Sequence, residues 1–161
     1  MLLQASQGLC CAQIAASSLG KTKINVDAAV SKNSGTSSVA AVARDSTSLF
    51  MGAFLVVLTD ISDSETLEIL ACREGLVLRK DLLLHNLVLA SDCANVVRSI
   101  KDEAMGPYGQ IVREIKTTVR EFQSIQFIHE GRGSNVDAHN LARSSLYKVL
   151  GLVFRSASRR V

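Results

Sequence analysis

Polar and apolar residues begin to alternate near residue 23, and an alternation with a period of two is typical of a β-strand. In the first such segment, Ile24 and Val26 alternate with Asn25 and Asp27. Turn-forming residues then separate this segment from two more apolar runs. The pattern predicts three strands joined by short turns, as in an antiparallel meander, over residues 23–30, 38–43 and 49–58.

The periodicity becomes helical after residue 60. Leu67 and Ala71 share one helical face with Leu78, so a helix is predicted from residue 65 onward. Ser64 is its predicted N-cap. Residues 82–90 have almost no alternation, which suits a strand buried on both faces by parallel pairing. The later segments predict a helix over 95–101, a helix over 111–122, a strand over 124–129 and a helix from 136 to about 152.

This order of elements predicts an α/β domain with a mixed five-stranded sheet, three strands antiparallel and two parallel, flanked by helices. We assign residues 21–152 to the domain, because no interdomain linker and no internal repeat is visible. Residues 1–20 are expected to form a poorly ordered leader. Residues 153–161 are expected to form a disordered basic tail.

Composition narrows the class of protein. The chain has 161 residues, of which 47% are hydrophobic and 20% charged, so one globular domain is expected. No apolar run approaches the roughly 18 residues that a membrane helix needs, so no membrane partner is expected. The net charge of +3 tolerates a polyanionic partner without requiring one.

The four cysteines show no pattern of a zinc site or of a disulfide framework. Cys72 falls within the predicted helix and Cys93 just after a predicted strand, where both suit small buried side chains. We therefore expect a reduced, intracellular setting. The nucleus or cytoplasm is the expected compartment, and the sequence leaves an organelle open.

Three carboxylates occupy elements that are otherwise apolar, namely Asp27, Glu68 and Asp92. Burying a carboxylate is costly unless it is paired or bound to a cation. Each also has an ordinary explanation, as a residue on a solvated strand face, on a helix surface, or at a helix N-cap. Together the three indicate a divalent-cation site, since carboxylate oxygens select hard cations such as Mg²⁺.

The chain resembles the ribonuclease H-like domain found in plant proteins and in the terminal domains of plant non-LTR retroelements. No single segment is specific, but four occur in the right order within the right types of element. The resemblance therefore implies the ribonuclease H-like fold. The segments are Lys-Ile-Asn-Val-Asp at 23–27, Leu-Glu-Ile-Leu-Ala-Cys-Arg-Glu-Gly-Leu at 67–76, Val-Leu-Ala-Ser-Asp at 88–92 and Asn-Val-Asp-Ala-His-Asn-Leu-Ala-Arg at 135–143.

The resemblance implies metal-assisted hydrolysis of the RNA strand of an RNA–DNA hybrid, with two Mg²⁺ or Mn²⁺ ions. Asp27 would bridge both ions, Glu68 and Asp92 would complete one site, and the last helix would supply the second. The wider family has a fourth acid where this chain has His139, an uncharged ligand that would hold the second ion more weakly. Asp137 would point to the other side of the helix. The candidate catalytic residues are therefore Asp27, Glu68, Asp92 and His139.

The candidate nucleic-acid contacts lie before the last helix. His129 is similar in position to a loop histidine that assists product release or proton transfer in catalytic relatives, and a structural or exposed histidine is the alternative. Arg132 and Asn135 are expected to meet phosphate or to orient the last helix, and the sequence does not separate these roles. Ala28 stands where the resembled family prefers Gly, so its methyl group is expected to crowd an approaching nucleic-acid backbone.

Two alternatives stand beside the ribonuclease interpretation. One is a nucleic-acid-binding or protein-interaction domain of the same fold with weak or no catalysis, and the other is a retroelement fragment without activity. The expected partner is an RNA–DNA hybrid, the expected state is a monomer, and no small-molecule cofactor is expected. Arg113, Lys116 and Arg120 form a basic stripe at helical spacing, a pattern more often solvated than used for binding.

Overall fold

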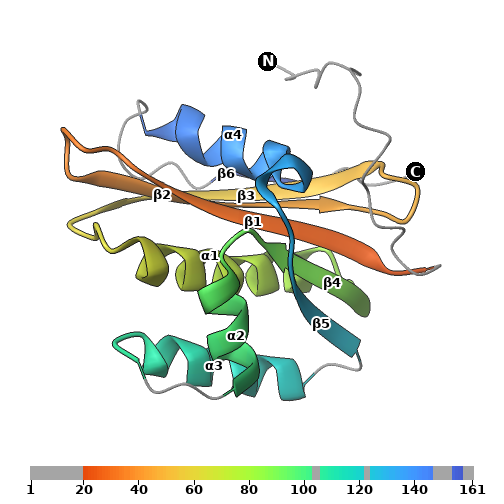
Figure 1. Ribbon diagram of the computed structural model, residues 1–161. Helices are drawn as coiled ribbons and strands as arrows, with labels where there is room; N and C mark the ends of the chain where they lie inside the picture. The colour runs from red at the N-terminus through yellow and green to blue at the C-terminus, as the bar shows by residue number, and fades with distance from the viewer. Residues whose placement is uncertain (1–19, 103–105, 122–123, 147–153, 158–161) are drawn as a thin grey trace.

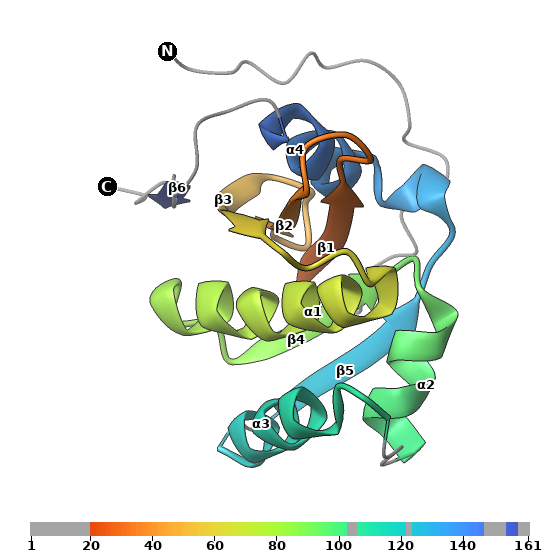
Figure 2. The same ribbon diagram turned by 90° about the vertical axis from the view of Figure 1, so that its left-hand side faces the viewer.

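One mixed β-sheet forms the centre of the computed structural model, which describes residues 20–102, 106–121, 124–146 and 154–157. Helices cover both faces of this sheet (Figures 1 and 2). The described elements, in chain order, are β1 (Thr22–Val30), β2 (Thr36–Arg44), β3 (Phe50–Thr59), α1 (Ser64–Asp81), β4 (Asn86–Ser91), α2 (Ala94–Asp102), α3 (Gly109–Arg120), β5 (Ser124–His129), the 3₁₀ turn η1 (Arg132–Ser134), α4 (Val136–Ser145) and β6 (Phe154–Ala157).

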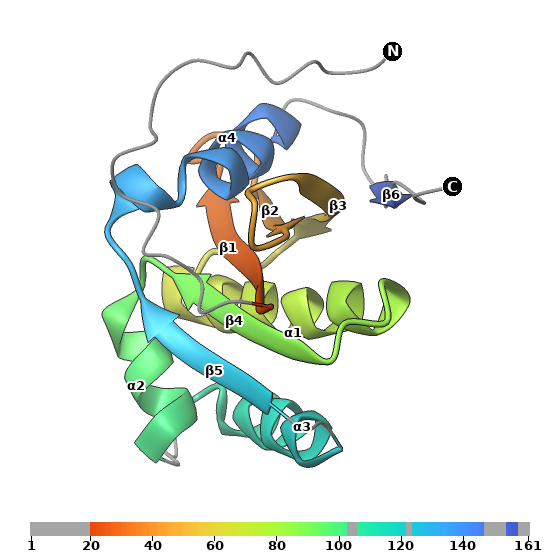
Figure 3. The ribbon, with the colours of Figure 1, turned by 90° about the vertical axis from the view of Figure 1, so that its right-hand side faces the viewer.

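The strands lie in the order β5-β4-β1-β2-β3-β6. β1, β2 and β3 form an antiparallel meander. β4 pairs with β1 and β5 pairs with β4, both in parallel, and Figure 3 shows β4 and β5 side by side. The prediction of a mixed α/β sheet with three antiparallel and two parallel strands is confirmed for β1 to β5.

The sixth strand, β6, was not predicted. It pairs antiparallel with β3, from Gly52↔Ala157 to Leu55↔Phe154. The expectation of a disordered tail is therefore wrong for residues 154–157, although four residues are too few to show a clear alternation in sequence. The predicted leader apart from Gly20, and the predicted extension of the last helix beyond Leu146, lie outside the described residues.

The alternation of β1 divides its side chains between the two faces of the sheet. Ile24 and Val26 are fully buried in the main core, on the face that α1 covers. Lys23, Asn25 and Asp27 instead contact α4 and the segment that precedes it. One strand thus supplies both the apolar support of α1 and the polar contacts of the last helix.

α4 lies on the opposite face of the sheet from α1 (Figure 2). Ala142 clusters with Ala40 of β2, and Ala138 clusters with Val42 and Ala53. These small side chains let the helix backbone approach the sheet closely. None of the helices that the structure describes is both long and apolar enough to cross a membrane.

The start of α1 differs by one residue from the prediction. Asp63, not Ser64, is the N-cap, because its carboxylate accepts a hydrogen bond from the backbone N–H of Thr66 at 2.8 Å. Hydrogen bonding to the side chain of Thr66, and to a smaller extent to its backbone N–H, lowers the pKa of Asp63. Both residue types are good N-caps, so the sequence alone did not separate these neighbours.

The end of α1 overturns part of another prediction. Residues 82–85 were assigned to the strand that follows, but the helix runs to Asp81 and its backbone is capped by Leu82, whose N–H donates to the backbone oxygen of Leu78. Leu83 has a positive φ of 54° and reverses the chain. The prediction failed because three leucines in a row suit a helix end as well as a buried strand. β4 begins only at Asn86.

Candidate metal centre

Two of the candidate metal ligands lie where β1 and β4 stop pairing. The parallel ladder between these strands ends at the pair Val26↔Ser91. Asp27 is the next residue of β1, and Asp92 is the next residue after β4. The end of the ladder therefore brings both carboxylates together beyond the last paired backbone groups.

Glu68 reaches the same point from α1. It is only 9% exposed, on the side of the helix that faces the sheet. Its Oε1 accepts a hydrogen bond from the backbone N–H of Ala28 at 3.2 Å, and its Oε2 accepts one from the hydroxyl of Ser91 at 3.4 Å. The Ala28 amide can make this contact because β4 no longer pairs with β1 beside it.

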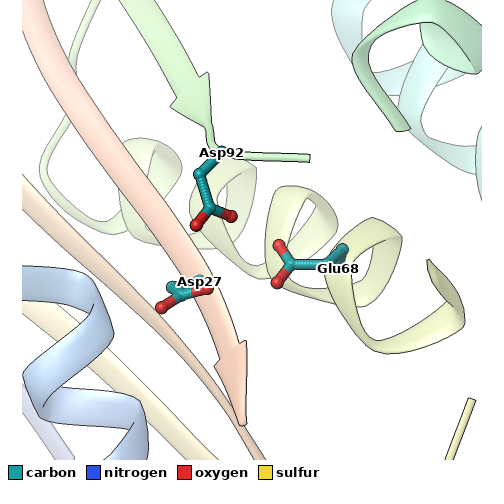
Figure 4. A group of neighbouring side chains, drawn as sticks. All are labelled: Asp27, Glu68 and Asp92. Atoms are coloured by element: carbon teal, nitrogen blue, oxygen red, sulfur yellow. The ribbon is translucent and has the colours of Figure 1, made fainter. Parts of the chain in front are cut away.

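Asp27, Glu68 and Asp92, which we call the acid cluster, each offer one oxygen within 4.8 Å of the others. Figure 4 shows the three carboxylates converging from β1, α1 and the end of β4. Oxygens bound to one Mg²⁺ lie about 2.1 Å from it and so at most about 4.2 Å apart. Side-chain shifts of a few tenths of an ångström would let one ion contact all three, and this all-oxygen donor set fits a hard divalent cation.

The cluster is electrostatically unfavourable without a cation. Burial raises the pKa of Glu68 to about 9, with further contributions from the charge of Asp27, a hydrogen bond to Asp27 and the charge of Asp92. The hydrogen bond from Ala28 acts in the opposite direction but is weaker. Metal-free Glu68 is therefore protonated at neutral pH, and a bound cation would replace that proton.

His139 contacts the acid cluster from the face of the sheet that α4 covers. Its Nδ1 lies 2.7 Å from Oδ2 of Asp27, whose side chain is almost fully buried. Asp137, two residues earlier, instead receives a hydrogen bond from Nε of Arg44 at 3.0 Å. The prediction that Asp137 points away from the centre is confirmed, and His139 lies beside Asp27, as the family resemblance implied.

Asn135 does not lie where it could bind nucleic acid. Its side chain is 1% exposed, and its Nδ2 donates to the backbone oxygen of Val26 at 2.8 Å. The expected phosphate contact is therefore wrong, and the second expectation, that Asn135 orients the last helix, agrees with the structure. Asn135 is the residue before α4, so this bond fixes the start of the helix to β1 one turn before His139.

Two further polar residues of β1 were missed by the sequence analysis. Lys23 forms a partly buried ion pair with Glu130, and the side chain of Asn25 donates to the backbone oxygen of Ser134 at 3.2 Å. With Asp27, they occupy alternate positions of one strand. Lys23 and Asn25 hold the segment that leads into α4, and Asp27 contacts the helix itself through His139. The alternation of polar residues was visible in the sequence, but their partners more than 100 positions away were not.

Comparison with known proteins places the chain in a family. Residues 25–145 match the family described as Reverse transcriptase-like, a span that contains the acid cluster and His139. This chain belongs to the Reverse transcriptase-like family. Among curated protein sequences, none matches it.

Solved structures show that this Reverse transcriptase-like chain has the ribonuclease H fold. The N-terminal RNase H domain of a Mycobacterium tuberculosis protein matches with a TM-score of 0.71 and 17% identity, over 79% of this chain and 94% of that one. RNase H1 from Halobacterium salinarum matches with a TM-score of 0.67 and 19% identity, over 79% and 98%. LC11-RNase H1, isolated from compost and solved with an RNA/DNA hybrid, matches with a TM-score of 0.67 and 17% identity, over 77% and 95%.

Two candidate nucleic-acid contacts of this Reverse transcriptase-like chain lie at the end of β5 and on the segment that links it to α4. Arg132 is highly exposed, and its Nε lies 3.3 Å from Oδ2 of Asp92. His129 is exposed at the end of β5, where its register partner is Ser91, the residue before Asp92. Both positions border the acid cluster, and their contact with nucleic acid remains a prediction.

The hydroxyl of Ser91 accounts for the turn into α2. Its oxygen accepts a hydrogen bond from the backbone N–H of Cys93 at 3.1 Å and also lies near Glu68. By residue type, either Ser91 or Asp92 suits the N-cap of this helix. Ser91 makes the local backbone contact, while the carboxylate of Asp92 belongs to the acid cluster.

Proposed function

We propose that this chain is a divalent-metal-dependent endonuclease that hydrolyses the RNA strand of RNA–DNA hybrids. The convergence of Asp27, Glu68 and Asp92 within 4.8 Å is the observation that carries the proposal. The ribonuclease H fold adds support, since LC11-RNase H1 and a foamy viral protease-reverse transcriptase, of which this chain matches 20%, were each solved with an RNA/DNA hybrid. Membership of the Reverse transcriptase-like family agrees with such a substrate.

The proposed cofactor is Mg²⁺ or Mn²⁺, held by one oxygen from each member of the acid cluster. A bound divalent ion supplies Lewis acidity, polarising the phosphoryl group and lowering the pKa of water. The protein contributes the position of the ligands: the Ala28 amide and the Ser91 hydroxyl orient Glu68, and His139 orients Asp27. These hydrogen bonds limit how far the carboxylates can turn away from the ion.

The exposed residues beside the cluster are the proposed contacts to the substrate. Arg132 lies next to Asp92 and carries a guanidinium that suits a phosphate oxygen. His129 is proposed to assist proton transfer or product release. Selection of RNA would come from contacts to 2′-hydroxyl groups, which distinguish RNA from DNA.

The setting of this activity is also a proposal. We place the protein inside the cell, in the nucleus or cytoplasm, as a monomer that needs no small-molecule cofactor. Microscopy of the tagged chain and light scattering of the purified chain would test the compartment and the monomeric state.

The direct test is cleavage of an end-labelled RNA–DNA hybrid, first with Mg²⁺ and then with Mn²⁺. Asp27→Asn should lower the cleavage rate by at least 100-fold, because it removes a charged ligand of the ion. Asp137→Asn is the matched control. It also replaces an aspartate by asparagine, but on α4, where Asp137 forms an exposed ion pair with Arg44. The control should keep the wild-type rate, as breaking an exposed pair costs little stability.

The same assay separates the proposal from its main alternative. If the chain binds the hybrid in gel shifts but does not cleave it with either metal, the chain is a nucleic-acid-binding domain and not a nuclease. If Asp27→Asn cleaves the hybrid at the wild-type rate, the acid cluster does not take part in cleavage.

A further inference from the structure

A carboxylate that bridges two cations gives one oxygen to each of them. The family resemblance assigns this bridging position to Asp27. In the structure, Oδ2 of Asp27 is already hydrogen-bonded to Nδ1 of His139 at 2.7 Å. That bond has the length of a strong hydrogen bond and leaves the other oxygen for the acid cluster.

The other cluster oxygens are also partly committed. Oε1 and Oε2 of Glu68 accept from Ala28 and Ser91, and Oδ2 of Asp92 faces Arg132 at 3.3 Å. One oxygen from each of the three side chains lies within 4.8 Å of the other two. This geometry fits one ion at the centre of the group.

No spare acid is available on the α4 side of Asp27. The segment from residue 130 to residue 146 contains two carboxylates, Glu130 and Asp137. Glu130 is paired with Lys23, and Asp137 is paired with Arg44. A second cation next to Asp27 would have His139 as its nearest new ligand, and the ring nitrogen of His139 that faces Asp27 is already in use.

The charge of the acid cluster also favours a single cation. Three ionised carboxylates carry a charge of −3, which one divalent cation reduces to −1. A second divalent cation would make the centre positive beside the guanidinium of Arg132. Like charges a few ångströms apart repel by several kcal/mol at an effective dielectric constant of about 20.

We infer that, in the free protein, this centre binds one divalent cation, and that His139 fills the place of a second by holding Oδ2 of Asp27. The inference rests on the proposed function, because it assumes that the acid cluster is a metal centre. It narrows that function to a single-ion site whose fourth position is a histidine that holds Asp27 instead of a carboxylate.

The test is a count of bound Mn²⁺ on the full chain without nucleic acid, from the loss of the free-ion signal in electron paramagnetic resonance. The wild type should bind one ion per chain. His139→Asp should bind two, since it removes the donor on Asp27 and adds a fourth carboxylate. Two adjacent Mn²⁺ ions should also broaden each other's spectrum. His139→Asn keeps a donor without charge and should still bind one ion.

His85→Asp is the matched control for the added charge. His85 is exposed in the turn before β4, at the opposite end of that strand from Asp92. This variant should bind one ion, like the wild type.

The outcomes distinguish the inference from the proposed function. Two ions on the wild type would overturn the inference and leave the nuclease proposal intact. No bound ion on the wild type would overturn both. One ion on a folded His139→Asp variant would show that His139 is not what excludes the second ion.

Discussion

Glu68 is the residue whose chemistry depends most on its surroundings. A glutamate on an exposed helix face would be ionised at neutral pH, whereas burial beside Asp27 and Asp92 raises the pKa of Glu68 to about 9. A proton and a cation therefore compete for the acid cluster. This competition links the stability of the protein to pH and to metal.

We expect the metal-free protein to lose stability as pH rises from about 4.5 to about 9. Between these values the folded state keeps a proton on Glu68 that the unfolded state has released. Each rise in pH therefore lowers the free energy of unfolding. The loss should approach about 1 kcal/mol per pH unit. Glu68→Gln should remove most of this slope, as measured by urea unfolding in EDTA across the pH range.

Glu114→Gln is the control for that experiment. Glu114 is half exposed on α3 and pairs with Arg73, so the variant should keep the wild-type slope. A wild-type stability that is flat between pH 5 and pH 9 would show that Glu68 is not protonated in the folded protein.

Asn135 provides a second test at this scale. Asn135→Ala should lower the free energy of unfolding by about 1–3 kcal/mol, because the backbone oxygen of Val26 would lose a buried donor. Asn140→Ala changes an exposed asparagine on the same helix and should cost less than about 0.5 kcal/mol. Equal urea midpoints for the two variants would contradict the importance of the bond to Val26.

The sequence predicted some of these residues and not others, for a physical reason. Asp27, Glu68 and Asp92 were recognisable because a carboxylate in an apolar strand or helix is unusual. A phosphate contact was one of the two roles expected for Asn135. In the sequence, an asparagine in a loop looks the same whether it binds solvent, phosphate or a backbone oxygen. Only the fold shows that Val26 lies beside it.

At the scale of elements, the contact of α1 with the sheet depends on Gly75. A methyl group at this position would lie 2.9 Å from Cγ1 of Val26 and 3.0 Å from Cδ1 of Leu89. Gly75→Ala should therefore destabilise the protein by about 1–3 kcal/mol, although alanine favours a helix by about 1 kcal/mol. Thermal or urea unfolding would measure the loss.

Gly109→Ala is the matched substitution. Gly109 is the first residue of α3, and a methyl group there would meet nothing within 4 Å. This variant should be neutral or slightly stabilising. If Gly75→Ala were equally stable, α1 would have room to shift away from β1 and β4.

The elements themselves were predictable where they were long and amphipathic. β1 to β3 and α1 followed from periodicity, whereas β4 followed from an apolar run with almost no alternation. Periodicity did not fix the residue where α1 ends, because Leu82 and its neighbours are equally apolar in a helix or a strand. β6 could not be predicted, since its pairing with β3 is a contact between distant segments.

For the whole molecule, the acid cluster joins three parts of the fold: β1, α1 and the end of β4. A cation that binds only the folded arrangement stabilises the protein, by about 2.7 kcal/mol at a concentration 100 times the dissociation constant. Mg²⁺ should therefore raise the thermal midpoint at pH 8. Asp27→Asn should abolish most of this rise, and Asp137→Asn should retain it. An equal rise in both variants would locate the metal effect elsewhere.

The end of the β1–β4 ladder has one more consequence, at the level of a single amide. The N–H of Ala28 points at Glu68 instead of a neighbouring strand, so its nuclear magnetic resonance signal is a built-in reporter of that carboxylate. Its chemical shift follows whether the carboxylate holds a proton or an ion. The occupancy of the centre can thus be followed in solution without a substrate or a turnover assay.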